Sequence, residues 1–64
     1  MSVEWARHEL AMRRREDAET QADGSWDAFA RMKRTWAKRR KEMGFSRAKA
    51  KAWLEIAERE YERV

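Results

Sequence analysis

Positive charge flanks a single glycine in the stretch Lys38-Arg39-Arg40-Lys41-Glu42-Met43-Gly44-Phe45-Ser46-Arg47-Ala48-Lys49-Ala50-Lys51. Gly44 can adopt the left-handed backbone conformation that commonly ends a helix. Ser46 can accept a hydrogen bond from the first turn of a following helix. The stretch therefore predicts the end of one helix, a tight turn and the start of another helix.

The charge of this stretch points to function. Seven of its fourteen residues are basic and one is acidic. Cations at the end of a helix are ordinary because they complement its negative C-terminal dipole. Arg47 and Lys49 are not ordinary, because they fall in the first turn of the next helix and face its positive end. Their presence predicts an anionic partner, with phosphate as the commonest candidate.

A second turn precedes this stretch at Asp23-Gly24-Ser25, where a glycine is again followed by a serine that can cap a helix. With Ser2 as the first cap, we expect three helices at about 2–22, 26–43 and 47–63. The chain has no proline and only two glycines, which argues against sheets. The prediction is an all-α three-helix hairpin or bundle that forms one small domain over 1–64.

Apolar stripes run along the second and third predicted helices. The stripe of the second helix contains Trp26, Phe29, Met32, Trp36 and Met43. The stripe of the third helix contains Ala50, Trp53, Leu54, Ala57, Tyr61 and Val64. We expect both stripes to be buried, with Trp36 at the centre of the core.

The first predicted helix is apolar on two sides near its start. Val3 and Leu10 lie on one side, and Trp5 and Met12 lie about 150° away, at 100° per residue. A three-helix monomer readily covers only one side, so we assign Trp5, Leu10 and Met12 to a protein interface and expect a homodimer. The following run, residues 13–17, is charged throughout and is expected to be solvated.

Length and composition limit the possible classes of protein. Sixty-four residues without cysteine give neither a disulfide framework nor a thiolate metal site. The net charge of +4 favours anionic partners. No stretch approaches the roughly 18 apolar residues that span a bilayer, and residues 1–5 lack the order of a secretory signal. We therefore expect a cytoplasmic protein without membrane contact.

Candidate catalytic and metal-binding residues are few. His8 and Glu9 begin like the zinc-protease helix motif, but Met12 stands where the second histidine is required. The serines are explained as helix caps, and there is no glycine-rich phosphate loop. We expect no catalytic residue, no metal, no cofactor and no small-molecule substrate, and therefore not an enzyme.

The expected function is that of a small regulator that binds an anionic partner, nucleic acid backbone first, at the basic corner between the second and third helices. An acidic protein surface is the other anionic candidate. The predicted anion-binding residues are Arg34, Lys38, Lys41, Ser46, Arg47, Lys49 and Lys51. The alternative is a protein-interaction module, an inhibitor or adaptor, that docks through the apolar faces of the first helix. Acidic residues of the first helix could also pair with the basic second helix, which would use up part of the charge run.

The helix–Gly–Phe–Ser–helix order resembles the helix-turn-helix motif, in which the second helix enters the major groove. This chain departs from the motif at Arg39 and Arg40, where small or apolar residues are usual. The third helix offers Arg47, Lys49 and Lys51 but no Asn or Gln on the face that would read bases. That face suits phosphates more than base edges.

Overall fold

The computed structural model describes residues 2–63, and within them it contains three helices and no strand. The helices are α1 (Ser2–Asp23), α2 (Trp26–Glu42) and α3 (Arg47–Glu62). The all-α, three-helix prediction is confirmed for this part of the chain. Val64 and the Ser2 side chain, which were assigned to the third stripe and to the first helix cap, lie outside what the structure describes.

Both turns form as the sequence predicts. Gly24 and Gly44 have φ angles of 72° and 75°, in the left-handed region that favours glycine. The Ser25 hydroxyl accepts a hydrogen bond from the Ala28 amide at 3.1 Å. The Ser46 hydroxyl accepts one from the Lys49 amide at 3.2 Å. Local capping therefore fixes where α2 and α3 begin.

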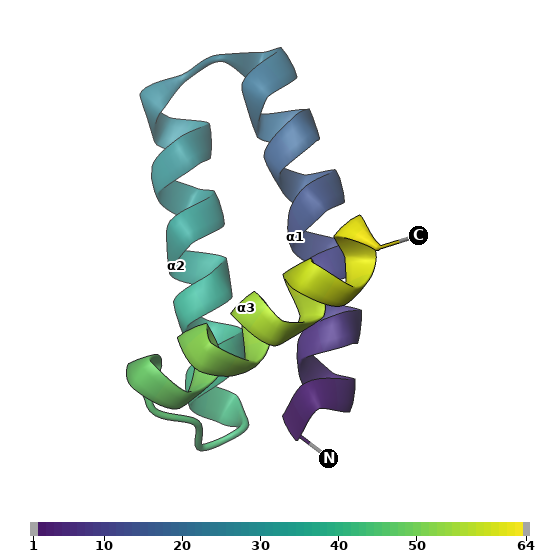
Figure 1. Cartoon of the computed structure of the whole chain (residues 1–64). Helices are drawn as coiled ribbons and strands as arrows, with labels where there is room; N and C mark the ends of the chain where they lie inside the picture. The colour runs from purple at the N-terminus through teal and green to yellow at the C-terminus, as the bar shows by residue number, and fades with distance from the viewer. Residues whose placement is uncertain (1, 64) are drawn as a thin grey trace.

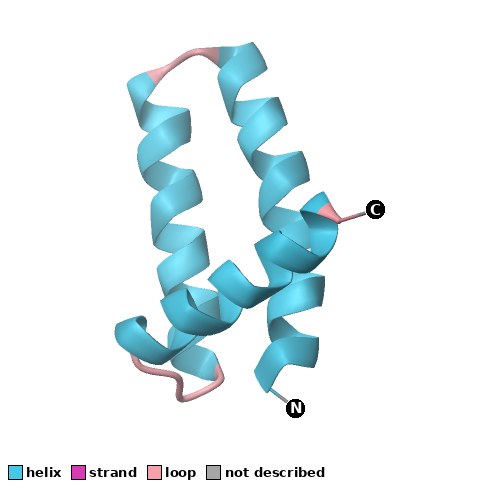
Figure 2. Ribbon diagram, in the orientation of Figure 1, coloured by secondary structure: helices cyan, strands magenta, loops and turns pink. Residues whose placement is uncertain are grey.

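The three helices form a flat molecule of 33 × 30 × 15 Å. Figure 1 shows α1 and α2 side by side and antiparallel. The third helix, α3, crosses one face of this hairpin at the end opposite the α1–α2 turn. Within residues 2–63, the loops drawn in Figure 2 are the two turns and Arg63, which follows α3. We call the half crossed by α3 the closed end (residues 3–13 and 36–63) and the opposite half, around the α1–α2 turn, the tip (residues 20–29).

An aromatic cluster holds the closed end together. The rings of Trp5 and Trp53 both meet Phe45 edge-on, at centroid distances of 4.9 and 4.7 Å. Ala6 and Ala50 are buried and let the helices approach closely. Trp5 is therefore half-buried against α3, and its assignment to a protein interface stays a prediction. Leu10 and Met12 are half-buried as well.

The tip has no such cover. Met32 of the α2 stripe is buried, but Trp26 is 87% exposed and Phe29 is 39% exposed. The expectation of one continuous buried stripe on α2 is wrong, because α3 crosses only the other half of the hairpin. Trp36, expected at the centre of the core, is half-buried. Two further stripe members are exposed, Met43 and Tyr61.

A charged network that begins in the closed end and extends to Glu16 joins α1 to α2. Glu9 is only 2% exposed, and its carboxylate accepts hydrogen bonds from Arg13 Nε at 2.6 Å and Arg39 Nη2 at 2.9 Å. Arg39 also donates two hydrogen bonds of 2.7 Å to Glu16. The predicted pairing of α1 acids with the basic α2 is thus confirmed. The predicted solvation of residues 13–17 is wrong for Arg13, Glu16 and Asp17, which are half-buried.

Ionisation within this network follows from its contacts. Hydrogen bonds from Arg39 and then from the Trp36 indole lower the pKa of Glu16 below its ordinary value, although partial burial opposes this. Hydrogen bonds to Glu16 and Glu9 raise the pKa of Arg39. Both groups are therefore held in their charged forms.

Candidate functional site: a basic cleft between the helices

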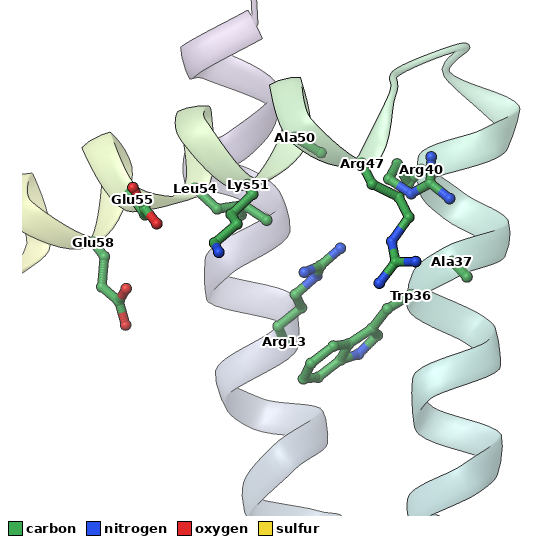
Figure 3. Close-up of a pocket in the computed structure, with 10 residues that line it drawn as sticks. All are labelled: Arg13, Trp36, Ala37, Arg40, Arg47, Ala50, Lys51, Leu54, Glu55 and Glu58. Atoms are coloured by element: carbon green, nitrogen blue, oxygen red, sulfur yellow. The ribbon is translucent and has the colours of Figure 1, made fainter.

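The three helices meet around an open cleft of about 440 Å³, drawn in Figure 3. We call it the basic cleft, because cationic side chains from all three helices line one end of it. Its lining consists of Arg13, Trp36, Ala37, Arg40, Arg47, Ala50, Lys51, Leu54, Glu55 and Glu58. The turn at Gly44 brings the start of α3 back over α2, and this places α3 residues opposite α1.

Arg47 and Lys51 come from the first two turns of α3. Figure 3 shows the Arg47 side chain reaching down over the Trp36 ring, toward the Arg13 guanidinium. Lys51 points into the space on the other side of Arg13. Among residues 2–63, no carboxylate forms an ion pair with Arg47 or Lys51. Their charges are therefore available to a ligand.

The floor of the cleft is more rigidly held. The Arg13 guanidinium carbon lies over the Trp36 ring, 4.8 Å from its centroid. Glu9 fixes Arg13 through the Nε hydrogen bond, and Glu16 fixes the indole by accepting from Trp36 Nε1 at 2.9 Å. Cation–π contact and hydrogen bonding thus hold a guanidinium and an indole together.

Arg40 plays a part in building the cleft. Its Nη1 donates a hydrogen bond of 2.7 Å to the Phe45 carbonyl, in the turn between α2 and α3. Because a guanidinium has five N–H donors, this contact leaves others for a ligand. Arg40 therefore ties the turn to α2 and adds positive charge at the same end of the cleft.

The charge of the cleft changes along α3. Glu55 and Glu58 line its far end, and a shallow depression beyond them is lined by Glu55, Glu58, Arg59 and Glu62. An anion entering the cleft is therefore attracted to the end near the α2–α3 turn and repelled from the other.

Of the predicted anion-binding residues, the structure brings only Arg47 and Lys51 into the cleft. The Ser46 hydroxyl caps α3 by accepting from the Lys49 amide, and it does not line the cleft. The remaining four are exposed but do not line the cleft: Arg34, Lys38, Lys41 and Lys49. Sequence reasoning missed Arg13, Trp36 and Arg40. The position of Arg40 beside the apolar stripe of α2 could have indicated that it lies near another helix. Nothing in the α1 sequence indicates that Arg13 lies near α3.

In residues 2–63, no group of three or more His, Asp and Glu side chains could hold a metal ion. In the same part of the chain, no helix combines the length and apolarity needed to cross a bilayer.

Comparisons with protein-family models, curated proteins and solved structures found no match to this chain.

Proposed function

We propose that this protein is a non-enzymatic regulator that binds nucleic acid through its phosphates, at the basic cleft and the exposed cations beside it. The observation that carries the proposal is the meeting of Arg13, Arg40, Arg47 and Lys51 at one end of the cleft. Three helices supply these cations, so the fold itself concentrates positive charge there. Arg34, Lys38 and Lys41 extend basic charge along α2.

The position of Arg47 supports an anionic ligand independently. The first turn of α3 contains no acidic residue, although an acidic side chain there would stabilise the helix. By contrast, Arg39 in the same charge run is fully occupied by Glu9 and Glu16. The run therefore divides into a structural part, at Arg39, and a part left for binding.

The test is a titration with a short nucleic acid at two salt concentrations. Binding through phosphates should weaken steeply as salt rises, because bound counterions are released. Arg47→Glu should reduce both the affinity and the salt dependence. Lys33→Glu is the matched control: it makes the same charge change on α2, outside the cleft lining.

Two outcomes would contradict the proposal. One is equal weakening by Arg47→Glu and Lys33→Glu, which would reflect net charge alone. The other is tighter binding to polyglutamate than to nucleic acid, which would favour an acidic protein as the partner.

A second proposal concerns self-association, and one observation favours it: Trp26 is 87% exposed at the tip. The apolar docking face was expected on α1 around Trp5, but that side chain packs on Phe45 and Trp53 and is half-buried. We infer instead that two copies pair through their tips. Beside Trp26 lies a shallow hollow of about 530 Å³ whose lining is uncharged: Thr20, Gln21, Gly24, Ser25, Trp26 and Phe29.

A second copy of the chain is the proposed occupant of this hollow, because the lining carries no charge. Two chains of net charge +4 repel each other at their basic surfaces, but they can approach through an uncharged patch. A two-fold arrangement would seat each Trp26 in the hollow of the other copy. Asp23 and Asp27 stand beside the patch and disfavour an anionic membrane.

Sedimentation at micromolar concentration should show a dimer, and Trp26→Ser should shift it to monomer. Ala22→Ser, an exposed change nearby on α1, is the control and should leave the dimer intact. A parent protein that stays monomeric, or that binds anionic vesicles through Trp26, would contradict this second proposal.

A further inference from the structure

We propose that the basic cleft holds one unpaired nucleotide, with its base stacked on the Arg13 guanidinium and its phosphate bound by Arg47 and Lys51. The inference rests on the proposed function and deepens it, because it selects single-stranded nucleic acid over duplex. In this arrangement the base and the phosphate of the bound nucleotide contact different residues of the cleft.

The stacking platform is the Arg13–Trp36 pair. The indole supports one side of the guanidinium at 4.8 Å, and Glu9 holds its Nε at 2.6 Å. Since Arg13 also lines the cleft, part of its surface faces the open space. Planar guanidinium groups stack on nucleic-acid bases, and this one is already oriented. A base that enters the cleft would extend the stack by one layer.

The phosphate end is formed by Arg47 and Lys51. They lie one helical turn apart on α3, and both line the cleft together with Arg13 (Figure 3). Leu54 lines the wall of the same cleft and offers an apolar surface to the sugar. A single nucleotide, with a flat aromatic base and an adjoining anion, matches this combination.

A duplex fits the same surface poorly. If α3 lay along a duplex, as in a helix-turn-helix, its face at Glu55, Glu58 and Glu62 would approach the phosphates. Paired bases are also stacked inside the duplex, where Arg13 cannot reach them without base flipping. A single strand needs only one nucleotide to turn into the cleft, at its cationic end.

The experiment compares three probes on the parent protein. The first is an oligothymidylate of about ten nucleotides, a length typical of single-strand sites. The second is an abasic oligomer with the same number of phosphates, and the third is a duplex of the same length. We expect the oligothymidylate to bind about tenfold more tightly than the abasic oligomer, because one base gains a stacking contact.

Two charge-conserving variants then locate the contact. Arg13→Lys keeps the charge but loses the planar platform, so oligothymidylate should bind no better than the abasic oligomer. Arg47→Lys is the matched control, and it should leave the ratio between these two probes unchanged. The comparison on the parent protein needs no variant, so it still decides the question if Arg13→Lys does not fold.

The outcomes separate this inference from the proposed function. If the parent binds the abasic oligomer as tightly as oligothymidylate, or binds duplex most tightly, the nucleotide site is overturned while phosphate binding stands. If Arg13→Lys folds and keeps the full preference for bases, Arg13 is not the platform. If none of the three probes binds, the proposed function itself fails.

Discussion

The two ends of the α1–α2 hairpin are both rich in aromatic residues, yet they differ sharply in burial. At the closed end, Trp5 and Trp53 each pack edge-on against Phe45 and form an aromatic cluster with it. At the tip, Trp26 and Phe29 also meet edge-on, at 6.5 Å, but they remain exposed. The difference is α3, which crosses one end only.

Helix length explains why one end stays open. With a rise of 1.5 Å per residue, the 22 residues of α1 extend about 33 Å, whereas the 16 residues of α3 extend about 24 Å. Because α3 also crosses at an angle, it covers still less of the hairpin (Figure 1). A short third helix can therefore build a core at one end of a hairpin but not along its whole length.

The largest effect should come from the closed end. Trp53→Ala should lower the free energy of unfolding by about 3 kcal/mol, since it removes the ring that packs against both Trp5 and Phe45. Phe29→Ala at the tip is the matched change and should cost less than about 1 kcal/mol. Urea unfolding of both variants measures the contrast. Equal losses would mean that the two ends are equally well packed.

The charged network should come next. Arg39→Met leaves Glu9 buried with Arg13 as its remaining partner, and should cost about 2–3 kcal/mol. Glu60→Gln is the comparison: its bond to Arg7 joins side chains that are 42% and 57% exposed, and its loss should change stability little. Thermal unfolding distinguishes the two. A similar small shift for both variants would show that burial of Glu9 does not matter.

Acidification should destabilise the protein by protonating Glu16, a member of the same network. Its pKa is lowered in the folded protein, mainly by the hydrogen bonds from Arg39. The stability that this group contributes is therefore present above its unfolded pKa of about 4.3 and is lost as pH falls through the lower folded pKa. Below pH of about 4.3, the parent should lose stability more steeply than Glu16→Gln. Parallel stability–pH curves would rule out a contribution from Glu16.

The smallest effect should be a gain. Arg47→Glu combined with Lys49→Glu removes two cations from the first turn of α3, and should stabilise the protein by about 0.3–1 kcal/mol at low salt for each change. The same variant should lose its affinity for nucleic acid. Measuring stability and binding on one sample checks both. A loss of stability would show that these side chains support the closed end.

The sequence was sufficient to predict the helices because their limits depend on local contacts. Gly24, Ser25, Gly44 and Ser46 act on neighbours within a few residues, so their roles can be inferred without knowing the fold. The burial of Trp5 and the exposure of Trp26 could not be inferred this way. Periodicity indicates which residues share a helix face, but only the path of α3 determines which face is covered.

The candidate site divides in the same way. Arg47 was predicted because a cation in the first turn of a helix is locally unfavourable, and Lys51 was predicted only as a member of the basic run. Arg13 was assigned to solvent, since a run of charged residues usually is solvated. Its position over Trp36 depends on Glu9, which holds Arg13 from within α1, and on Glu16, which holds the indole across the α1–α2 interface. Such a contact is a property of the packed hairpin and has no signature in the α1 sequence.

The ion pair between Arg7 and Glu60 joins residues 53 positions apart, whereas the hydrogen bond from Trp36 to Glu16 spans 20 positions. Closing the longer loop costs roughly 0.9 kcal/mol more in chain entropy. During synthesis, α1 and α2 also emerge before α3. The polar hairpin can therefore assemble first, and the apolar cluster is completed last. Until α3 leaves the ribosome, Trp5 lacks its contact with Trp53, so the nascent hairpin has aromatic side chains without α3 packing at both ends.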